Sequence, residues 1–281
     1  MAQKVGFIGI GAMGRPFATN IVKAGFDLIV YDLDPEPIAA LVKLGAKAAK
    51  SPREVAEYAD IVDIAVREEE NAVADKRDGP EPPVEMVLHG PDGLLAGGHP
   101  GLTVVIHTSM HPTKMEAIAA EIKSHGIDVL DAQMSGGTQG VESKTLCIMC
   151  GGDRSTLEKV RPVLETTGGN IFLLGGMGMG AVTKILQNTM TAEHLLAASE
   201  GFRLAAAAGV DVEVFQEVVQ TSAASSHVAD VFLHGRGQQD ASWAYYPILR
   251  NALDLAHKYD ITLPGAATAM QALAHSLRKP R

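Results

Sequence analysis

The sequence predicts an α/β fold in which an N-terminal doubly wound domain is followed by an all-α C-terminal domain. Short apolar runs alternate with helical stretches through the first half of the 281 residues, as in successive βαβ units. These runs are apolar throughout, which is typical of parallel strands covered on both faces. Further along, helix-forming residues dominate and no convincing strand follows. We therefore expect domains at residues 1–170 and 171–281.

The expected strands are apolar runs that lie between turns and helical stretches. Helical spacing is found at Gly14–Ala24 and Ile38–Leu44, each after an apolar run. The strand-like runs, in chain order, are Val5–Ile8, Leu28–Tyr31, Ile61–Val66, Val104–His107, Val129–Leu130 and Leu146–Met149. This order of elements predicts a mainly parallel sheet with helices on both faces.

Two later segments differ from the βαβ pattern. Arg67–Pro83 is charged and rich in proline, which predicts a mobile surface loop. Helix formers dominate Ala181–Ala208, which predicts one long helix of about 40 Å at 1.5 Å per residue. The glycine-rich turn Gly175–Gly180 precedes this helix and is expected to act as the interdomain hinge.

Charge and composition exclude several classes of protein. The net charge of −9, without a basic stripe, argues against a nucleic-acid partner. No apolar run reaches the roughly 18 residues of a membrane span, and the N-terminus lacks the shape of a signal peptide. Cys147 and Cys150 lie three apart in a strand-like run, so they face opposite sides and predict two buried thiols, not a metal or redox pair. We expect a cytoplasmic protein without a metal.

The segment Gly9-Ile-Gly-Ala-Met-Gly14 fits the pattern G-x-G-x-x-G and stands between a strand and a helix, as a dinucleotide-binding turn requires. Gly9 permits the tight turn, Gly11 lets the backbone approach a pyrophosphate, and Gly14 lets the helix pack closely on the strand. The helix N-terminus then attracts phosphates. The residues expected to bind cofactor here are Gly9, Ile10, Gly11, Ala12, Met13 and Gly14.

Asp32 ends the second strand-like run, 18 positions after Gly14. A carboxylate at this place accepts hydrogen bonds from the ribose hydroxyls of NAD and repels the 2′-phosphate of NADP. Leu33, which is also expected at the cofactor, follows, so no arginine stands there to hold that phosphate. The sequence therefore favours NAD over NADP.

These motifs resemble those of the β-hydroxyacid dehydrogenase family, which includes 3-hydroxyisobutyrate dehydrogenase and tartronate semialdehyde reductase. Lys4–Gly14 is similar to the family's opening segment. Asp131-Ala-Gln-Met-Ser-Gly-Gly137 is similar to its substrate-binding D-A-P-V-S-G-G, and Gly178–Asn188 to its catalytic G-x-G-x-x-x-K-x-x-x-N. The resemblance covers nearly the whole chain. It implies a Rossmann-type domain, related to that of 6-phosphogluconate dehydrogenase, and an oxidoreductase that uses NAD(P) on CH–OH groups.

Lys184 is the residue expected to transfer the proton. It lies one turn into the long helix, and Asn188 shares its helix face at i+4. A lysine partly desolvated in a cleft has a pKa lowered toward neutrality, which suits a general acid or base. The resemblance assigns catalysis to this lysine, with Asn188 orienting it or hydrogen-bonding the substrate.

Small residues after two strands are further candidates for the site. Ser135, Gly136 and Gly137 offer a hydroxyl and approachable N–H groups, either as a cradle for a substrate carboxylate or as a simple tight turn. Thr108 and Ser109 match the family's hydroxyl pair near the nicotinamide and follow a strand at the edge where ligands bind.

Two departures from the family pattern bear on the expected substrate and cofactor contacts. The family's K-D-L motif falls on Pro247-Ile-Leu249, so its lysine is absent, which suggests a substrate less acidic or bulkier than usual. Val66 and Arg67 replace a Leu-Pro pair, and Arg67 either contacts cofactor or substrate or is a solvated loop residue. Trp243 either lines an apolar pocket or packs between helices, and His227 falls near the family's substrate-reading segment.

We therefore expect hydride transfer between NAD and a β-hydroxy acid, or a related hydroxy compound, and its carbonyl form. Two alternatives remain open, imine reduction on the same fold and a non-catalytic dinucleotide-binding protein. Relatives that reduce imines often lack the catalytic lysine, so Lys184 argues against the first. The expected partners are a small-molecule substrate and further copies of this chain, in a homodimer or homotetramer packed through the long helix.

Overall fold

The computed structural model describes residues 3–67, 84–233 and 241–276, with the backbone alone at residues 241–244 and 274–276. Contacts divide the chain into two compact units, the first ending at Lys184 and the second beginning at Ile185. Most of the stretch expected to form a mobile loop, Glu68–Pro83, lies outside the described residues.

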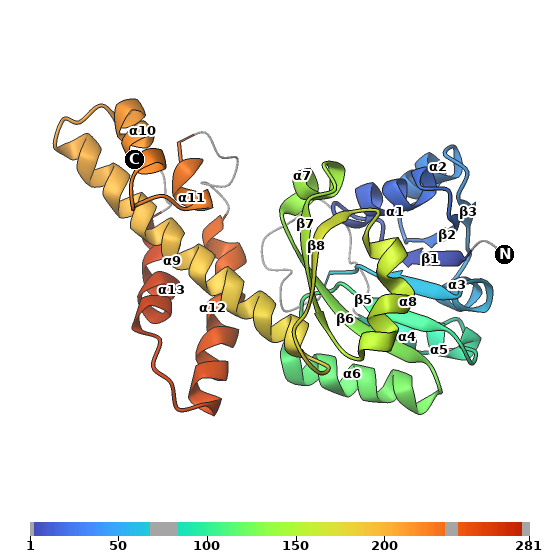
Figure 1. Cartoon of the computed structure of the whole chain (residues 1–281). Helices are drawn as coiled ribbons and strands as arrows, with labels where there is room; N and C mark the ends of the chain where they lie inside the picture. The colour runs from blue at the N-terminus through green and yellow to red at the C-terminus, as the bar shows by residue number, and fades with distance from the viewer. Residues whose placement is uncertain (1–2, 68–83, 234–240, 277–281) are drawn as a thin grey trace. The chain divides into compact units, whose positions relative to one another are not determined.

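The first unit is built on one eight-stranded sheet in the order β3-β2-β1-β4-β5-β6-β7-β8 (Figure 1). Strands β1 to β6 run parallel, β7 is antiparallel to β6, and β8 is parallel to β7. The strands are β1 Lys4–Ile8, β2 Asp27–Tyr31, β3 Lys47–Ala48, β4 Ile61–Ile64, β5 Thr103–Ile106, β6 Asp128–Ser135, β7 Leu146–Gly151 and β8 Gly168–Leu173. This mainly parallel sheet confirms the predicted α/β class.

Two of these strands, β3 and β8, were not expected from apolar runs. Both lie at an edge of the sheet. The two residues of β3 are exposed, and β8 has no fully buried residue. An edge strand with solvent on its free side needs few apolar residues, so a search for apolar runs does not find it.

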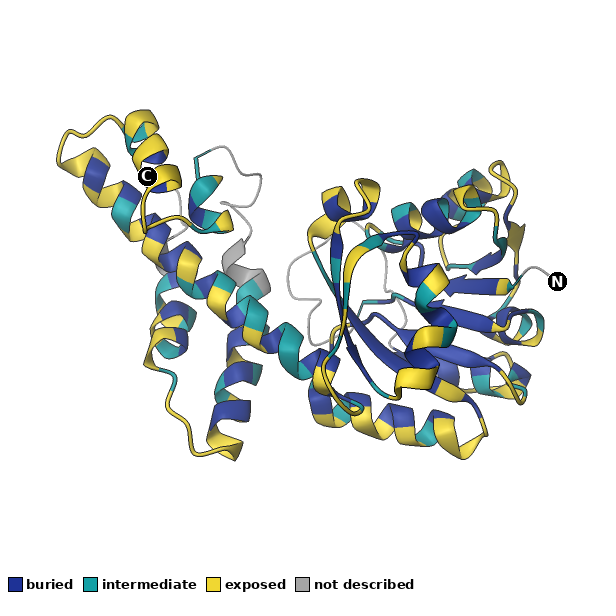
Figure 2. Ribbon diagram, viewed as in Figure 1, coloured by how far each residue is buried: buried dark blue, intermediate teal, exposed yellow. Residues whose placement is uncertain are grey.

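Helices cover both faces of the sheet. On one face α1, α2 and α8 bury side chains such as Phe17 and Leu157, and on the other α3 to α6 bury Val55 and Met115. Figure 2 shows the central strands buried between these layers. The helices are α1 Gly14–Lys23, α2 Pro35–Val42, α3 Pro52–Tyr58, α4 Val84–Leu88, α5 Leu94–Gly97, α6 Pro112–Ser124, α7 Gly137–Glu142 and α8 Arg154–Leu164. This is the doubly wound arrangement that the sequence predicts.

In the described part of the second unit, all regular structure is helical. The long helix α9, Met179–Ala207, begins in the first unit and agrees with the helix expected at Ala181–Ala208. The other helices are α10 Val212–Thr221, α11 His227–Asp230, α12 Ala241–Lys258 and α13 Pro264–Ser276. One apolar cluster joins α9, α12 and α13, and a second joins α9, α10 and α11. Among the described helices, none is both long enough and apolar enough to cross a membrane.

The two cysteines differ in burial. Cys150 is buried in the core of the sheet, whereas Cys147 is half-buried, and neither forms a disulfide. The expectation of two buried thiols is therefore wrong for Cys147. This residue pairs with Ser135 at the end of β6, where the sheet approaches solvent.

Candidate active site

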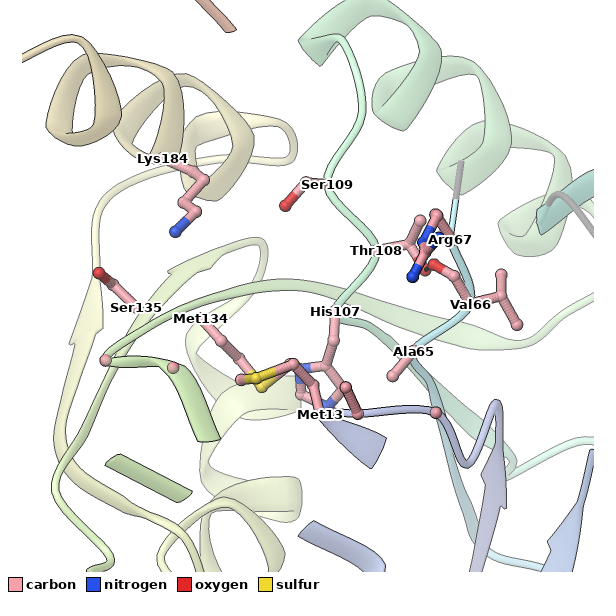
Figure 3. Close-up of a pocket in the computed structure, with 14 residues that line it drawn as sticks. Met13, Ala65, Val66, Arg67, His107, Thr108, Ser109, Met134, Ser135 and Lys184 are labelled. Atoms are coloured by element: carbon pink, nitrogen blue, oxygen red, sulfur yellow. Dashed lines mark hydrogen bonds between the residues drawn. The ribbon is translucent and has the colours of Figure 1, made fainter. Parts of the chain in front are cut away.

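A cavity of about 350 Å³ lies at the carboxyl ends of the parallel strands in the first unit. Its wall is formed by segments that follow β1, β4 and β5, by the end of β6 and the start of α7, and by one residue of α9 (Figure 3). The lining residues are Gly11, Ala12, Met13, Ala65, Val66, Arg67, His107, Thr108, Ser109, Met134, Ser135, Gly136, Gly137 and Lys184. Ligands of open α/β sheets bind at this edge.

The glycine turn after β1 forms one wall of the cavity. Gly9 has a φ of +92°, and a Cβ there would lie 2.7 Å from the carbonyl oxygen of Ala65. A Cβ on Gly14 would lie 1.9 Å from the carbonyl oxygen of Gly9, so only glycine permits this approach of α1 to the turn. The N-cap residue of α1, Met13, makes no side-chain hydrogen bond to the first turn of the helix. Its N–H groups can therefore bind the oxygens of a pyrophosphate.

Asp32 follows β2 and is fixed by the same turn. One carboxylate oxygen accepts a hydrogen bond from the backbone N–H of Ile10, and the other accepts one from Asp34 at 2.9 Å. The next side chain, Leu33, is 59% exposed and carries no charge. Five of the predicted cofactor-binding residues lie outside the cavity lining, namely Gly9, Ile10, Gly14, Asp32 and Leu33.

Lys184 enters the cavity from α9, and Figure 3 shows its amino group pointing into the cavity. Burial lowers the pKa of Lys184 to about 8, while Cys147 opposes this with a small raising effect. The described residues offer Lys184 no hydrogen bond or ion pair. The amine can therefore exchange a proton near neutral pH, as an acid or base must.

The start of α9 is held against the sheet by Asp131 of β6. The backbone N–H of Ala181 donates to Asp131 Oδ2 over 2.8 Å. A Cβ on Gly180 would lie 2.7 Å from the same oxygen, so glycine is needed there. Burial raises the pKa of Asp131 to about 6, although hydrogen bonds from Gln133, Ala181 and Gly180 lower it. These contacts place Lys184, one turn further along, at the cavity.

The Ser135–Gly137 turn connects β6 to α7 and lies on the same side of the cavity as Lys184 (Figure 3). Gly136 and Gly137 have φ values of +126° and +62°, which other residues rarely adopt. Both glycines are exposed and Ser135 is half-buried, so a ligand can approach the hydroxyl and the turn backbone. The turn is therefore accessible to a ligand, and its role as a carboxylate cradle stays a prediction.

The segments after β4 and β5 are joined to each other and to β6. The Thr108 hydroxyl donates to the carbonyl oxygen of Val66 over 2.9 Å. The Ser109 hydroxyl donates to Gln133 Oε1 over 3.0 Å. Arg67 also lines the cavity, so the structure brings Val66, Arg67, Thr108 and Ser109 to one place.

Sequence reasoning missed His107, Ala65 and Met134, which also line the cavity. His107 Nε2 lies 2.8 Å from Asp63 Oδ1, and both side chains are fully buried. His107 Nδ1 lies 2.7 Å from the carbonyl oxygen of Ala132, which can only accept, so Nδ1 carries a proton. One further proton must lie between Nε2 and the carboxylate, so the pair has no net charge. The signal in the sequence was Asp63, a charged residue inside the apolar run Ile61–Val66.

Three predicted site residues, Asn188, His227 and Trp243, belong to the second unit. Asn188 is half-buried on α9, one turn beyond Lys184. His227 is exposed at the start of α11, where Ser226 caps the helix. Trp243 lies on α12, but its side chain is outside the described part of the chain. Pro247, which stands at the family's lysine position, is buried inside α12.

The described residues contain no group of three or more His, Cys, Asp or Glu side chains that could hold a metal ion. The side chains that line the cavity offer a lysine, an arginine, a histidine and hydroxyls, beside the glycine turn after β1.

Known proteins are similar over nearly all of the chain. Residues 4–176 match the model of the NAD-binding domain of 6-phosphogluconate dehydrogenase, and residues 178–279 match the NAD-binding model of NADP-dependent 3-hydroxyisobutyrate dehydrogenase. The chain is 36% identical to the NAD-dependent L-serine dehydrogenase of Pseudomonas aeruginosa, over 82% of this chain and 73% of that enzyme. It is 34% identical to the 2-hydroxy-3-oxopropionate reductase of Escherichia coli, over 98% of this chain and 87% of that enzyme.

The fold has solved counterparts as well. The structure of 3-hydroxyisobutyrate dehydrogenase from Mycobacterium tuberculosis with L-serine matches with a TM-score of 0.81. The identity is 26%, and the match covers 98% of this chain and 93% of that one. The similarity thus includes both units and the glycine turn, the Asp131–Gly137 segment and the start of α9.

Proposed function

The chain belongs to the β-hydroxyacid dehydrogenase family, and we propose that it interconverts a β-hydroxy acid and its carbonyl form with Lys184 as the proton-transferring residue. It is an oxidoreductase that uses NAD on CH–OH groups, as its relatives do. The observation that carries the catalytic assignment is the lysine whose pKa falls to about 8 in the cavity that also holds the glycine turn and the Ser135–Gly137 turn.

The residues present fit the dinucleotide. The uncapped first turn of α1 and the close approach at Gly9 and Gly14 suit a pyrophosphate. Asp32, fixed at the end of β2, would receive the ribose hydroxyls, and its charge favours NAD over NADP. Val66, Arg67, Thr108 and Ser109 would hold the nicotinamide end. When bound, NAD supplies the hydride acceptor, or NADH the donor, and the protein's own groups manage the proton.

Lys184 performs that proton transfer. In oxidation, its neutral amine accepts the proton of the substrate hydroxyl. In reduction, its ammonium form donates a proton to the carbonyl oxygen. A pKa of about 8 leaves both forms populated near neutral pH, whereas an exposed lysine would be almost wholly protonated.

The Ser135–Gly137 turn binds the substrate carboxylate. A hydroxyl and turn N–H groups suit an anion and add no further charge to the site. Pro247 is buried in α12 at the place of the family's lysine, and the cations that line the cavity are Lys184 and Arg67. Asn188 orients the lysine or the substrate, and His227 and Trp243 are assigned to the substrate side from the sequence.

A substrate panel tests the proposed function. 3-Hydroxyisobutyrate, L-serine and other β-hydroxy acids would be incubated with NAD and with NADP, and NADH absorbance would be followed. We expect turnover of at least one β-hydroxy acid and a higher kcat/KM with NAD. Lys184→Ala should lower kcat at least about 100-fold, whereas the surface control Lys123→Ala should not.

Other outcomes would assign a different function. Turnover of Lys184→Ala within a fewfold of wild type would refute the proposed role of the lysine. Reduction of a cyclic imine in place of hydroxy acids would support the imine reductase alternative. Tight NADH binding with no turnover of any substrate would support a non-catalytic dinucleotide-binding protein.

We infer in addition that the chain forms a homodimer or homotetramer in the cytoplasm. On α9, Leu186, Met190 and Leu204 are 48%, 59% and 71% exposed, and a second copy would cover such side chains. Free thiols at Cys147 and Cys150 suit a reducing compartment. A monomer mass of 29.6 kDa by light scattering would contradict the oligomer, and export of a tagged chain would contradict the location.

A further inference from the structure

Gln133 is a buried residue whose side chain joins two parts of the candidate site. Its Nε2 donates to the carbonyl oxygen of Thr108 over 3.1 Å and to Asp131 Oδ1 over 3.0 Å. Its Oε1 accepts from the Ser109 hydroxyl over 3.0 Å. The side chain is fully buried in β6, below the cavity. It occupies the third position of the Asp131–Gly137 segment, where the family pattern has proline.

The partners determine how the amide is oriented. A carbonyl oxygen and a carboxylate oxygen can only accept, so the NH₂ group must face Thr108 and Asp131. The amide oxygen is then the atom left for the hydroxyl of Ser109. No reversed orientation satisfies all three partners.

The two ends of this network lead to different functional groups. On one side, Asp131 accepts the backbone N–H of Ala181 over 2.8 Å and thereby fixes the turn of α9 that precedes Lys184. On the other side, Thr108 reaches Val66 over 2.9 Å and Ser109 borders the cavity. Gln133 is the side chain that connects the lysine's helix to the segments assigned to the nicotinamide end.

We propose that Gln133 is a positioning residue for the dehydrogenase reaction, which keeps the Thr108–Ser109 segment and the start of α9 in register across the cavity. The inference rests on the proposed function of the cavity. It assigns to Gln133 a role in this chain that a proline at the same position cannot perform, because proline has no side-chain donor or acceptor.

The network predicts a particular dependence on pH. Ionised Asp131 accepts hydrogen bonds from Gln133 and from the backbone of α9. Burial raises the pKa of Asp131 to about 6, and the loss of a hydrogen-bond donor would raise this pKa further. The ionisable groups that interact with Asp131 are His107, beside β5, and Cys150 on β7, whose pKa burial raises to about 12. The thiol is therefore neutral between pH 6 and 9, and α9 contributes backbone N–H donors.

Two variants of Gln133 give opposite expectations. Gln133→Met keeps the side-chain volume but removes the donor to Asp131, so the Asp131 carboxyl protonates more readily. As the pH is lowered, the variant should therefore lose activity at a higher pH than wild type does. We expect kcat/KM about tenfold lower at neutral pH and an acid limb moved up by about 1 pH unit. Gln133→Glu places a second carboxyl beside Asp131, and the pair repels once both are ionised. Its activity relative to wild type should therefore fall as pH rises from 6 to 9.

The readouts are kcat and KM across that pH range and the Kd of NADH from its fluorescence, which does not require turnover. Gln216→Met is the matched control. Gln216 is 2% exposed on α10 and makes comparable bonds, with Nε2 donating to Ala229 and Oε1 accepting from Leu233. It should lower Tm to a similar degree and leave the pH profile and the NADH affinity unchanged.

The proposal is overturned if both Gln133 variants keep wild-type kinetics and NADH affinity, or if their losses are equal at every pH and match those of Gln216→Met. Should Gln133→Met fail to fold, Gln133→Glu decides through its opposite pH trend. If wild type binds NADH but turns over no hydroxy acid, the proposed function is refuted, but the proposed role of Gln133 is not. The pH dependence of the Kd of NADH then still decides the role of Gln133.

Discussion

Replacing Lys184 with methionine should make the protein more stable while removing its activity. Burial lowers the pKa of this lysine from 10.5 to about 8. At about 1.4 kcal/mol per pKa unit, the buried ammonium group therefore destabilises the folded state by about 3 kcal/mol. Allowing for screening at a half-buried side chain leaves a gain of about 2 kcal/mol in Lys184→Met, which corresponds to a rise in Tm of about 5 °C.

The pH dependence of this gain has a definite sign. Below pH 8 both folded and unfolded chains hold the proton, so wild type bears the full cost and the variant's advantage is largest. Between about 8 and 10.5 the folded chain releases its proton while the unfolded chain keeps it, so wild-type stability rises relative to the variant. The advantage should vanish above this window.

Thermal unfolding of both proteins at pH 7, 9 and 10.5 measures this difference, and kcat is measured alongside. For wild-type oxidation, kcat/KM should rise through pH 8, and for reduction it should fall, because the required form of the lysine differs. A lower Tm of the variant at pH 7, or a difference in Tm that does not change with pH, would refute the electrostatic reasoning.

Three further substitutions test other parts of the site. Asp32→Ser should raise KM for NAD and increase the ratio of NADP to NAD efficiency at least about tenfold; an unchanged ratio in steady-state kinetics would contradict the assignment. Gly14→Ala should lower Tm and abolish the stabilisation of the fold by NADH, because its Cβ would lie 1.9 Å from Gly9 O. Asp63→Ala should cost about 3 kcal/mol in urea unfolding, since it leaves His107 buried without its partner; the exposed control Asp92→Ala should cost little, and equal losses would argue against the pair.

Features that depend on local backbone sterics could be predicted from the sequence. The turn from Gly9 to Gly14 needs glycine for space, and a strand before it and a helix after it complete a pattern that few other structures share. The same holds for the apolar central strands, whose burial on both faces leaves a continuous signal. Lys184 was singled out because Gly178–Asn188 resembles the family's catalytic segment, and its catalytic role stays a prediction.

Features that depend on distant pairing could not be predicted. Nothing in the residues of β7 indicates that it runs antiparallel to β6, because strand direction leaves no mark on composition. The edge strand β8 begins with Gly168-Gly169-Asn170, which interrupts the apolar pattern. His107 and Gln133 were missed because each has a partner far along the chain, Asp63 at 44 residues from His107 and Ser109 at 24 residues from Gln133.

The contact between Asp131 and the first turn of α9 limits how the nucleotide-binding half can be produced alone. A fragment ending at Gly176, where the first family match stops, would retain the buried carboxylate and lose the Ala181 N–H that it accepts. Asp131 Oδ2, buried without that donor, would favour protonation of the carboxyl or draw in water and loosen β6. A fragment that ends beyond Lys184 keeps the contact between α9 and Asp131. It should therefore be more stable than a fragment that ends with the last strand of the sheet.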